Sequence, residues 1–149
     1  MRMAHYLEIG LSSRLDEVQA AILLVLLGNL AAGNAERRAS AAYFLERFEA
    51  LPLQLPLTDP GAIFHQFAIV HPKRDSLAAV LREQFGVGTG VHYAPALHRH
   101  EAFAAYARDP MPETERLEKG LLSLPIQPEI SVPFREQIAG AVEAALQHV

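Results

Sequence analysis

The stretch from residue 18 to residue 27 reads VQAAILLVLL and is the most apolar part of the chain. Serines followed shortly by acidic residues are typical of a helix start, so we predict a helix that begins at Ser12 or Ser13. From Ile22 to Leu27 this helix is apolar on every face, which indicates that it is covered on all sides. A chain of 149 residues offers little protein to surround it, so we expect part of its surface to meet another chain or a further domain. The alternative is a central core helix.

Composition and charge exclude several classes of protein. The apolar run is too short to cross a bilayer, and the first residues lack the apolar core of a signal peptide, so we expect a soluble, cytoplasmic protein that does not enter a membrane. The net charge of −4 argues against binding to nucleic acid, because that needs a basic surface. The absence of cysteine excludes disulfides and thiol catalysis.

The rest of the chain alternates between helical and extended patterns. Adjacent antiparallel strands with helices on one face would satisfy this order, so the predicted fold class is α+β. Apolar spacing and capping residues predict helices over 35–50, 75–85, 99–107, 112–120 and 132–147, and β-branched or aromatic runs predict extended segments over 65–71, 87–93 and 122–126.

Three histidines lie close together in the sequence and are candidates for binding. The spacing of His92, His98 and His100 matches no common metal-binding signature, so we expect no metal site and interpret these residues as lining a polar pocket or a loop surface. If residues 87–93 form a strand, His92 and Tyr93 point to opposite faces, one into a cleft and one into the core. Their imidazole and phenol groups, with His98, could bind a hydroxylated or phosphorylated ligand. The alternative is a core tyrosine with surface histidines.

The segment GVGTG at residues 86–90 has the glycines of a phosphate-binding loop but not its context. A helix precedes it and an extended segment follows, which is the reverse of the order that phosphate loops need. We therefore predict that these glycines end a helix and allow a tight entry into a strand. No serine lies in the sharp strand-to-helix turn that nucleophilic serine catalysis needs.

Several blocks, in order, resemble one enzyme family. The blocks are GLSSRLDEVQAA at 10–21, Arg37-Arg38 with Ala42-Tyr43, His65, Arg74-Asp75, GVGTGVHY at 86–93, His98, Glu115 and LLSLPIQP at 121–128. Together they resemble the DegT/DnrJ/StrS family of pyridoxal-phosphate-dependent sugar aminotransferases, over the family's C-terminal part only. The resemblance implies the small C-terminal domain of a fold-type-I aminotransferase, with a short, mostly antiparallel sheet covered by helices and preceded by a long linking helix. Residues 1–33 would then join a large domain, and residues 34–149 would form the small domain.

The resemblance also implies where the cofactor chemistry resides. In this family the large domain holds pyridoxal phosphate and the Schiff-base lysine, and every matching block lies after that lysine. The chain has two lysines, Lys73 and Lys119. Lys73 lies in a predicted turn and Lys119 precedes LLSLP, and neither context predicts the desolvated pocket that a Schiff-base lysine needs. We therefore expect no catalytic lysine and no bound cofactor in this chain alone.

Site residues follow from the resemblance position by position. Ser12 takes the place of an asparagine that reaches the cofactor phosphate in the partner subunit's active site, and its shorter side chain reaches less far. His92, Tyr93 and His98 match residues near the sugar-nucleotide pocket, where His92 would aid proton transfer or substrate placement. The first helix departs from relatives, which commonly carry charged residues at the positions of Leu24 and Leu26.

Three functional hypotheses follow. The first is the C-terminal portion of a nucleotide-sugar aminotransferase from a truncated or split gene, inactive alone and completed by a separately encoded large domain. The second is a non-catalytic dimerisation or binding module, with Ile22–Leu27 as the face of a homodimer. The third is a histidine metal site.

Overall fold

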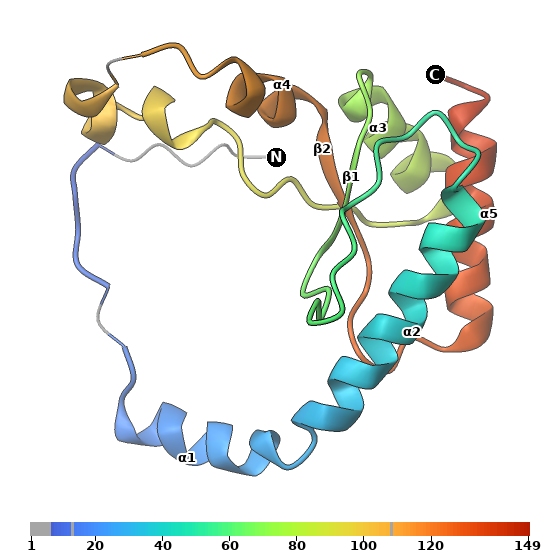
Figure 1. The fold of residues 1–149 in the computed structure, drawn as a ribbon, viewed down its shortest axis with the longest axis horizontal. Helices are drawn as coiled ribbons and strands as arrows, with labels where there is room; N and C mark the ends of the chain where they lie inside the picture. Colours follow the sequence, from blue (N-terminus) through green and yellow to red (C-terminus); the bar gives the residue numbers. More distant parts are fainter. Residues whose placement is uncertain (1–6, 13, 108) are drawn as a thin grey trace.

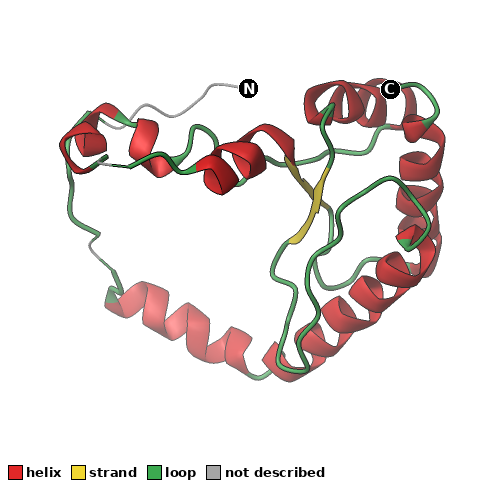
Figure 2. Ribbon diagram, turned by 45° about the horizontal axis from the view of Figure 1, so that its top comes forward, coloured by secondary structure: helices red, strands yellow, loops and turns green. Residues whose placement is uncertain are grey.

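The computed structural model describes residues 7–12, 14–107 and 109–149. It has the α+β architecture that the sequence predicts, with helices around a two-stranded sheet (Figures 1 and 2). The elements in order are α1 (Glu17–Leu27), α2 (Leu30–Phe48), β1 (Phe67–Val70), α3 (Arg74–Phe85), the 3₁₀ helices η1 (Leu97–Arg99) and η2 (Glu101–Tyr106), α4 (Pro112–Gly120), β2 (Leu121–Leu124) and α5 (Val132–Leu146).

The two strands form the centre of the molecule. They are antiparallel, with Phe67 opposite Leu124 and Val70 opposite Leu121. A two-stranded sheet has little stability alone, so it depends on the helices packed against it. Helix α5 packs against both α2 and α3, and α4 leads directly into β2 (Figure 1).

An aromatic cluster forms one side of the core. Phe44 and Phe48 of α2 stack with ring centroids 5.5 Å apart, and Phe44 lies 5.3 Å from Phe67 of β1. All three rings are fully buried, together with Leu77 of α3 and Ile138 of α5. This packing joins α2, α3, α5 and the sheet into one core, because side chains of all four contribute to it.

Helix α1 lies outside this core. None of its residues is buried, and its large apolar side chains are more than half exposed, reaching 78% for Val25. Figure 1 shows the helix extending away from the sheet. The core-helix alternative is therefore wrong. Asp16 caps the helix by accepting a hydrogen bond of 2.7 Å from the Gln19 N–H, so the predicted start at a serine is also wrong for Ser12, and Ser13 lies outside the described residues.

Two other predicted boundaries are corrected. Helix α2 begins at Leu30 rather than at residue 35 and runs through Gly33. A Cβ at Gly33 would lie 3.3 Å from Pro128 Cγ, so this glycine serves close packing inside the helix and does not break it. The range 99–107, predicted as one α-helix, holds the last residue of the 3₁₀ helix η1 and all of the 3₁₀ helix η2.

Residues 87–93 do not form the predicted strand. Their pairing with β2 is limited to a single bridge between Gly90 and Ser123. The chain does not continue as a strand beyond this bridge, because the His92 ring folds back over Gly90. The glycine prediction holds at Gly86, which ends α3 with a positive φ of 66°.

Within the described residues no single helix is both long and apolar enough to span a lipid bilayer. Only α1 and α2 taken together reach the required length and hydropathy, and they are bent by 67° where they meet.

Candidate functional site

His92 lies at the centre of the candidate site, and three features hold its ring in place. Nδ1 lies 3.0 Å from the Oγ of Ser123, which is buried on β2. The backbone of Ser123 bonds in both directions to Gly90, with N···O distances of 2.7 and 3.0 Å. A Cβ on Gly90 would come within 2.5 Å of His92 Cε1, so a glycine is required for this ring position.

Tyr93 lies beside His92 and is open to solvent. Its ring meets the imidazole edge-on, with centroids 5.4 Å apart, and 78% of the residue is exposed. The two side chains line the same hollow. The prediction that one of the pair enters the core is therefore wrong, and so is the alternative of a core tyrosine.

The hollow that His92 shares with Tyr93 has a volume of about 630 Å³. Glu118 of α4 is the one Asp, Glu, Lys or Arg among its described lining residues, and we call it the glutamate hollow. Its size is that of a small-molecule site. Its remaining lining residues are Pro95, Ala96, Leu97, His100, Thr114, Leu117 and Leu121.

A second hollow, of about 500 Å³, also has His92 in its wall. Its described lining includes Arg37, His65 and Thr89 and contains no carboxylate, and we call it the arginine hollow. The Arg37 Nη1 donates to the carbonyl oxygens of His65 at 3.2 Å and Ile126 at 3.3 Å, which holds the guanidinium in place. His92 therefore lines both a hollow with a carboxylate and a hollow with a cation.

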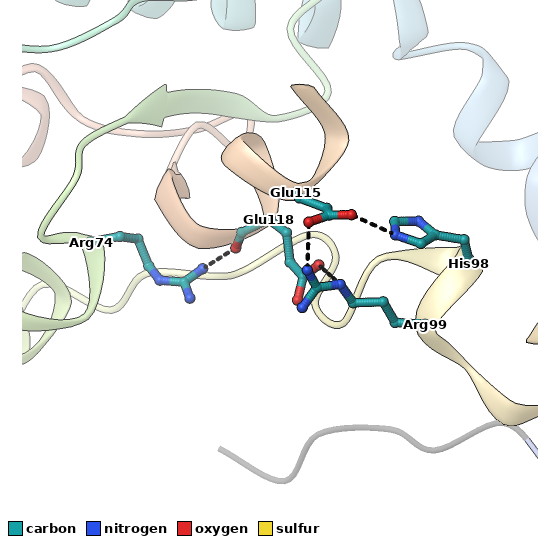
Figure 3. A network of polar contacts seen from close by, with 5 residues as sticks. All are labelled: Arg74, His98, Arg99, Glu115 and Glu118. Carbon is teal, nitrogen blue, oxygen red and sulfur yellow. Dashed lines mark hydrogen bonds and ion pairs between the residues drawn. The ribbon is translucent and has the colours of Figure 1, made fainter. Parts of the chain in front are cut away.

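His98 points to α4 and lines neither of these hollows. Its Nε2 lies 3.5 Å from Glu115 Oε1 (Figure 3), and it lines a separate cavity of about 240 Å³. The Arg99 Nη2 donates to Glu115 Oε2 at 2.9 Å, and its Nε lies 3.4 Å from Glu118 Oε2. The hydrogen bond from Arg99 is the main cause that lowers the pKa of Glu115. The structure thus brings His92 and Tyr93 together but places His98 in a network of polar contacts with Glu115 and Arg99.

Arg74 contacts the C-terminal end of α4. It is almost fully buried, and its Nη1 donates to the carbonyl oxygens of Glu118 and Leu121, both at 3.2 Å (Figure 3). These carbonyls belong to the last turn of α4 and the first residue of β2. The arginine therefore fixes the junction that carries Glu118 into its hollow.

Ser12, Lys73 and Lys119 lie on the surface. Ser12 is exposed ahead of α1, Lys73 is exposed at the start of α3, and Lys119 is exposed near the end of α4. A Schiff-base lysine needs an enclosed pocket, so these residues do not by themselves fit pyridoxal phosphate. No three His, Asp or Glu side chains gather into a metal-binding group within the described ranges.

The decisive observation comes from comparison with known proteins. The sequence pattern of the DegT/DnrJ/EryC1/StrS aminotransferase family matches residues 1–143. The chain belongs to this family.

Individual members of the DegT/DnrJ/EryC1/StrS family show how much of a relative the chain represents. It is 38% identical over 137 residues to the UDP-N-acetyl-3-dehydro-α-D-glucosamine 3-aminotransferase of Acidithiobacillus ferrooxidans, covering 91% of this chain and 36% of that protein. It is 36% identical to the dTDP-3-amino-3,6-dideoxy-α-D-galactopyranose transaminase of Aneurinibacillus thermoaerophilus, covering 91% and 37%. The chain therefore spans less than two fifths of these relatives and corresponds to a C-terminal part of the family.

Solved structures of the DegT/DnrJ/EryC1/StrS family confirm the fold. DesV of Streptomyces venezuelae superposes with a TM-score of 0.84 at 34% identity, over 94% of this chain and 39% of DesV. An aminotransferase of the family from Brucella abortus gives a TM-score of 0.80 at 31% identity, over 91% and 37%. The fold is that of part of a fold-type-I aminotransferase, a class that depends on pyridoxal phosphate.

Sequence reasoning missed the residues that hold the site. Ser123, Arg37 and Glu115 lie in blocks that resemble the DegT/DnrJ/EryC1/StrS family, namely LLSLPIQP, the paired arginines and the glutamate ahead of LLSLPIQP. These blocks were the sequence signal that could have pointed to the three residues. They do not show the contact of Ser123 with His92, because the two residues are 31 positions apart and meet through the bridge at Gly90.

Proposed function

We propose that the chain is the C-terminal portion of a pyridoxal-phosphate-dependent nucleotide-sugar aminotransferase, which transfers an amino group to a keto-deoxysugar nucleotide. The match of residues 1–143 to the family carries this proposal, since the relatives compared above are named as transaminases of UDP- or dTDP-linked sugars. The cofactor and its lysine would come from a large domain that these blocks do not include. The chain alone would then be inactive.

Within that enzyme, we propose that His92 and Tyr93 contact the substrate. Support comes from their shared hollow, and from the contacts that hold the ring of His92, which lines two hollows. His98 lines a neighbouring cavity, and its substrate-binding role stays a prediction. Ser12 likewise stays a prediction as a contact to the cofactor phosphate of a partner subunit.

The proposed division into two parts is that residues 1–33 join the large domain and residues 34–149 form the small domain. Two observations support it: α1 buries none of its residues, and the buried apolar core begins at Ala41. The boundary lies inside α2, which would make that helix the rigid link between the parts. The partner would be a second copy or a separately encoded large domain, in the cytoplasm.

A chimera tests this function. This chain would replace the matching part of the Aneurinibacillus thermoaerophilus transaminase, and amination of a dTDP-linked keto sugar would be measured with pyridoxal phosphate and an amino donor. We expect turnover by the chimera and none by the chain alone. Transamination by the chain alone would contradict the proposed inactivity, and a folded, cofactor-binding chimera without turnover would contradict the proposed role.

A non-catalytic dimerisation module is the second candidate, and the exposed apolar surface of Ile22–Leu27 favours it. Such a surface is typical of a protein interface. Sedimentation velocity over a range of concentrations would show a dimer. A chain that stays monomeric at the highest concentration would remove the main support for this candidate.

A further inference from the structure

Among the described residues, the hydroxyl of Ser123 has one hydrogen-bond partner, the ring of His92, and His92 lines both hollows. Ser123 is only 5% exposed. Its backbone is held by the bridge to Gly90, and its Oγ lies 3.0 Å from Nδ1 of His92. Within the part of the chain that the structure describes, Oγ makes no second hydrogen bond.

The lack of a second partner for this hydroxyl favours one direction of the hydrogen bond. If Nδ1 carried the ring proton and donated it to Oγ, the proton of the serine would have no acceptor among the described residues. Buried polar groups in native proteins are nearly always paired, and a serine hydroxyl has a single proton to place. The paired arrangement is the one in which Ser123 donates and Nδ1 accepts.

The other nitrogen of the ring, Nε2, is then the one left free to bind a ligand. Nε2 makes no hydrogen bond within the described residues, and it is not among their buried, unpartnered atoms. A neutral imidazole that accepts at Nδ1 carries its proton on Nε2 and donates there. The arginine hollow adds the Arg37 guanidinium as a second donor, and no carboxylate lies in its described lining.

We propose that Ser123 is a positioning residue that keeps the proton of neutral His92 on Nε2, so that His92 donates a hydrogen bond to an oxygen atom of the ligand. The ligand class is one rich in acceptor oxygens, such as the keto, hydroxyl or phosphoryl oxygens of a nucleotide sugar. This inference rests on the proposed function and deepens it, because it assigns His92 to substrate placement and not to accepting a proton.

Nitrogen NMR of the chain alone tests the proposal. With ¹⁵N-labelled histidine, the ring nitrogens of His92 would be recorded at about pH 8.5, where histidine side chains are ordinarily neutral. We expect a bare Nδ1 and a protonated Nε2. In Ser123→Ala the Nδ1 resonance should shift, because its hydrogen-bond donor is gone. Ser76→Ala removes an exposed hydroxyl on α3 and should leave the His92 resonances unchanged.

Two results would overturn the proposal: a protonated Nδ1 in the unmodified chain, or an Nδ1 resonance that Ser123→Ala does not move. If Ser123→Ala does not fold, the spectrum of the unmodified chain still decides the position of the proton. Ser123→Thr keeps the hydroxyl, and we expect it to keep a bare Nδ1.

The active chimera gives a separate readout. Loss of one positioned hydrogen bond should raise the KM of Ser123→Ala for the nucleotide sugar by about tenfold, with a smaller effect on kcat. An unchanged KM would contradict the role in substrate placement. A chimera that never turns over would count against the proposed function, while the NMR result on the chain alone would still decide the role of Ser123.

Discussion

At the scale of single residues, the His92 ring is held by one hydrogen bond and by the absence of one side chain. Ser123 engages Nδ1, and the bare Cα of Gly90 leaves room for the ring edge. Both contacts come from small, uncharged residues. Their effect is to limit the positions that the imidazole can take before any ligand arrives.

Gly90→Ala should displace the ring. The new Cβ would lie 2.5 Å from His92 Cε1, so the ring must move away and the hydrogen bond to Ser123 must weaken. We expect a changed Nδ1 resonance and a lowered thermal midpoint. Gly88→Ala is the matched control, because a Cβ there has no neighbour within 4 Å. An unmoved ring in Gly90→Ala would show that the glycine is not required.

The stability of the folded chain should depend on pH through the carboxyl group of Glu143. The hydrogen bond from Arg47 of α2 lowers the pKa of Glu143 on α5. A carboxyl with a lowered pKa in the folded state contributes stability above its unfolded pKa, and this contribution is lost as the pH falls through the folded value. Glu143→Gln should therefore lower the thermal midpoint at pH 7 and have little effect near pH 3.

The control for this pH series is Glu46→Gln, which changes an exposed carboxylate on the same helix as Arg47. The thermal midpoint of Glu46→Gln at pH 7 should stay close to that of the unmodified chain. Equal loss at pH 7 and pH 3 in Glu143→Gln would contradict the assignment to the ion pair with Arg47.

At the scale of elements, the parts that could be predicted have local start and stop signals. Helix α4 spans the predicted residues 112–120, and α5 begins at the predicted residue 132, because proline and serine at a helix start act within their own turn. The segment 87–93 could not be predicted, since its path depends on one long-range bridge and on the ring of His92 over Gly90. The local sequence pattern cannot show contacts between residues that are far apart in the chain.

Ser131→Ala tests the cap of α5. The serine Oγ accepts from the Phe134 N–H at 3.4 Å, and loss of a cap costs about 1 kcal/mol. We expect a reduction of that size in the free energy of unfolding, measured by urea denaturation. Ser76→Ala, at an exposed position inside α3, should cause no such loss. An unchanged midpoint in Ser131→Ala would mean that the long contact does not stabilise the helix.

At the scale of the whole molecule, the core and α1 have separate roles. The core joins α2, α3, α5 and the sheet, whereas α1 has an apolar surface that nothing described in this chain covers. The run Ile22–Leu27 predicts from the sequence alone that this surface meets another chain or a further domain, because a helix that is apolar all round needs cover that a small chain lacks. That contact stays a prediction.

Leu23→Glu with Leu27→Glu tests this separation. Both side chains are more than half exposed, so the free energy of unfolding should change by no more than about 0.5 kcal/mol. Leu77→Ala in the core should cost about 2–5 kcal/mol in the same urea titration. The double change should abolish self-association or turnover by the chimera. A large loss of stability in the isolated double variant would show that α1 supports the core.

The exposure of α1 has a practical consequence for detecting a partner of this chain. Its backbone N–H groups belong to a helix without buried side chains, so local opening should be frequent and hydrogen–deuterium exchange there rapid. Whatever covers the helix must suppress that opening. Slowed exchange of the amides of Glu17–Leu27 in a mixture of this chain with other proteins would therefore show that a partner has bound to the helix. This measurement does not require that the partner has first been isolated.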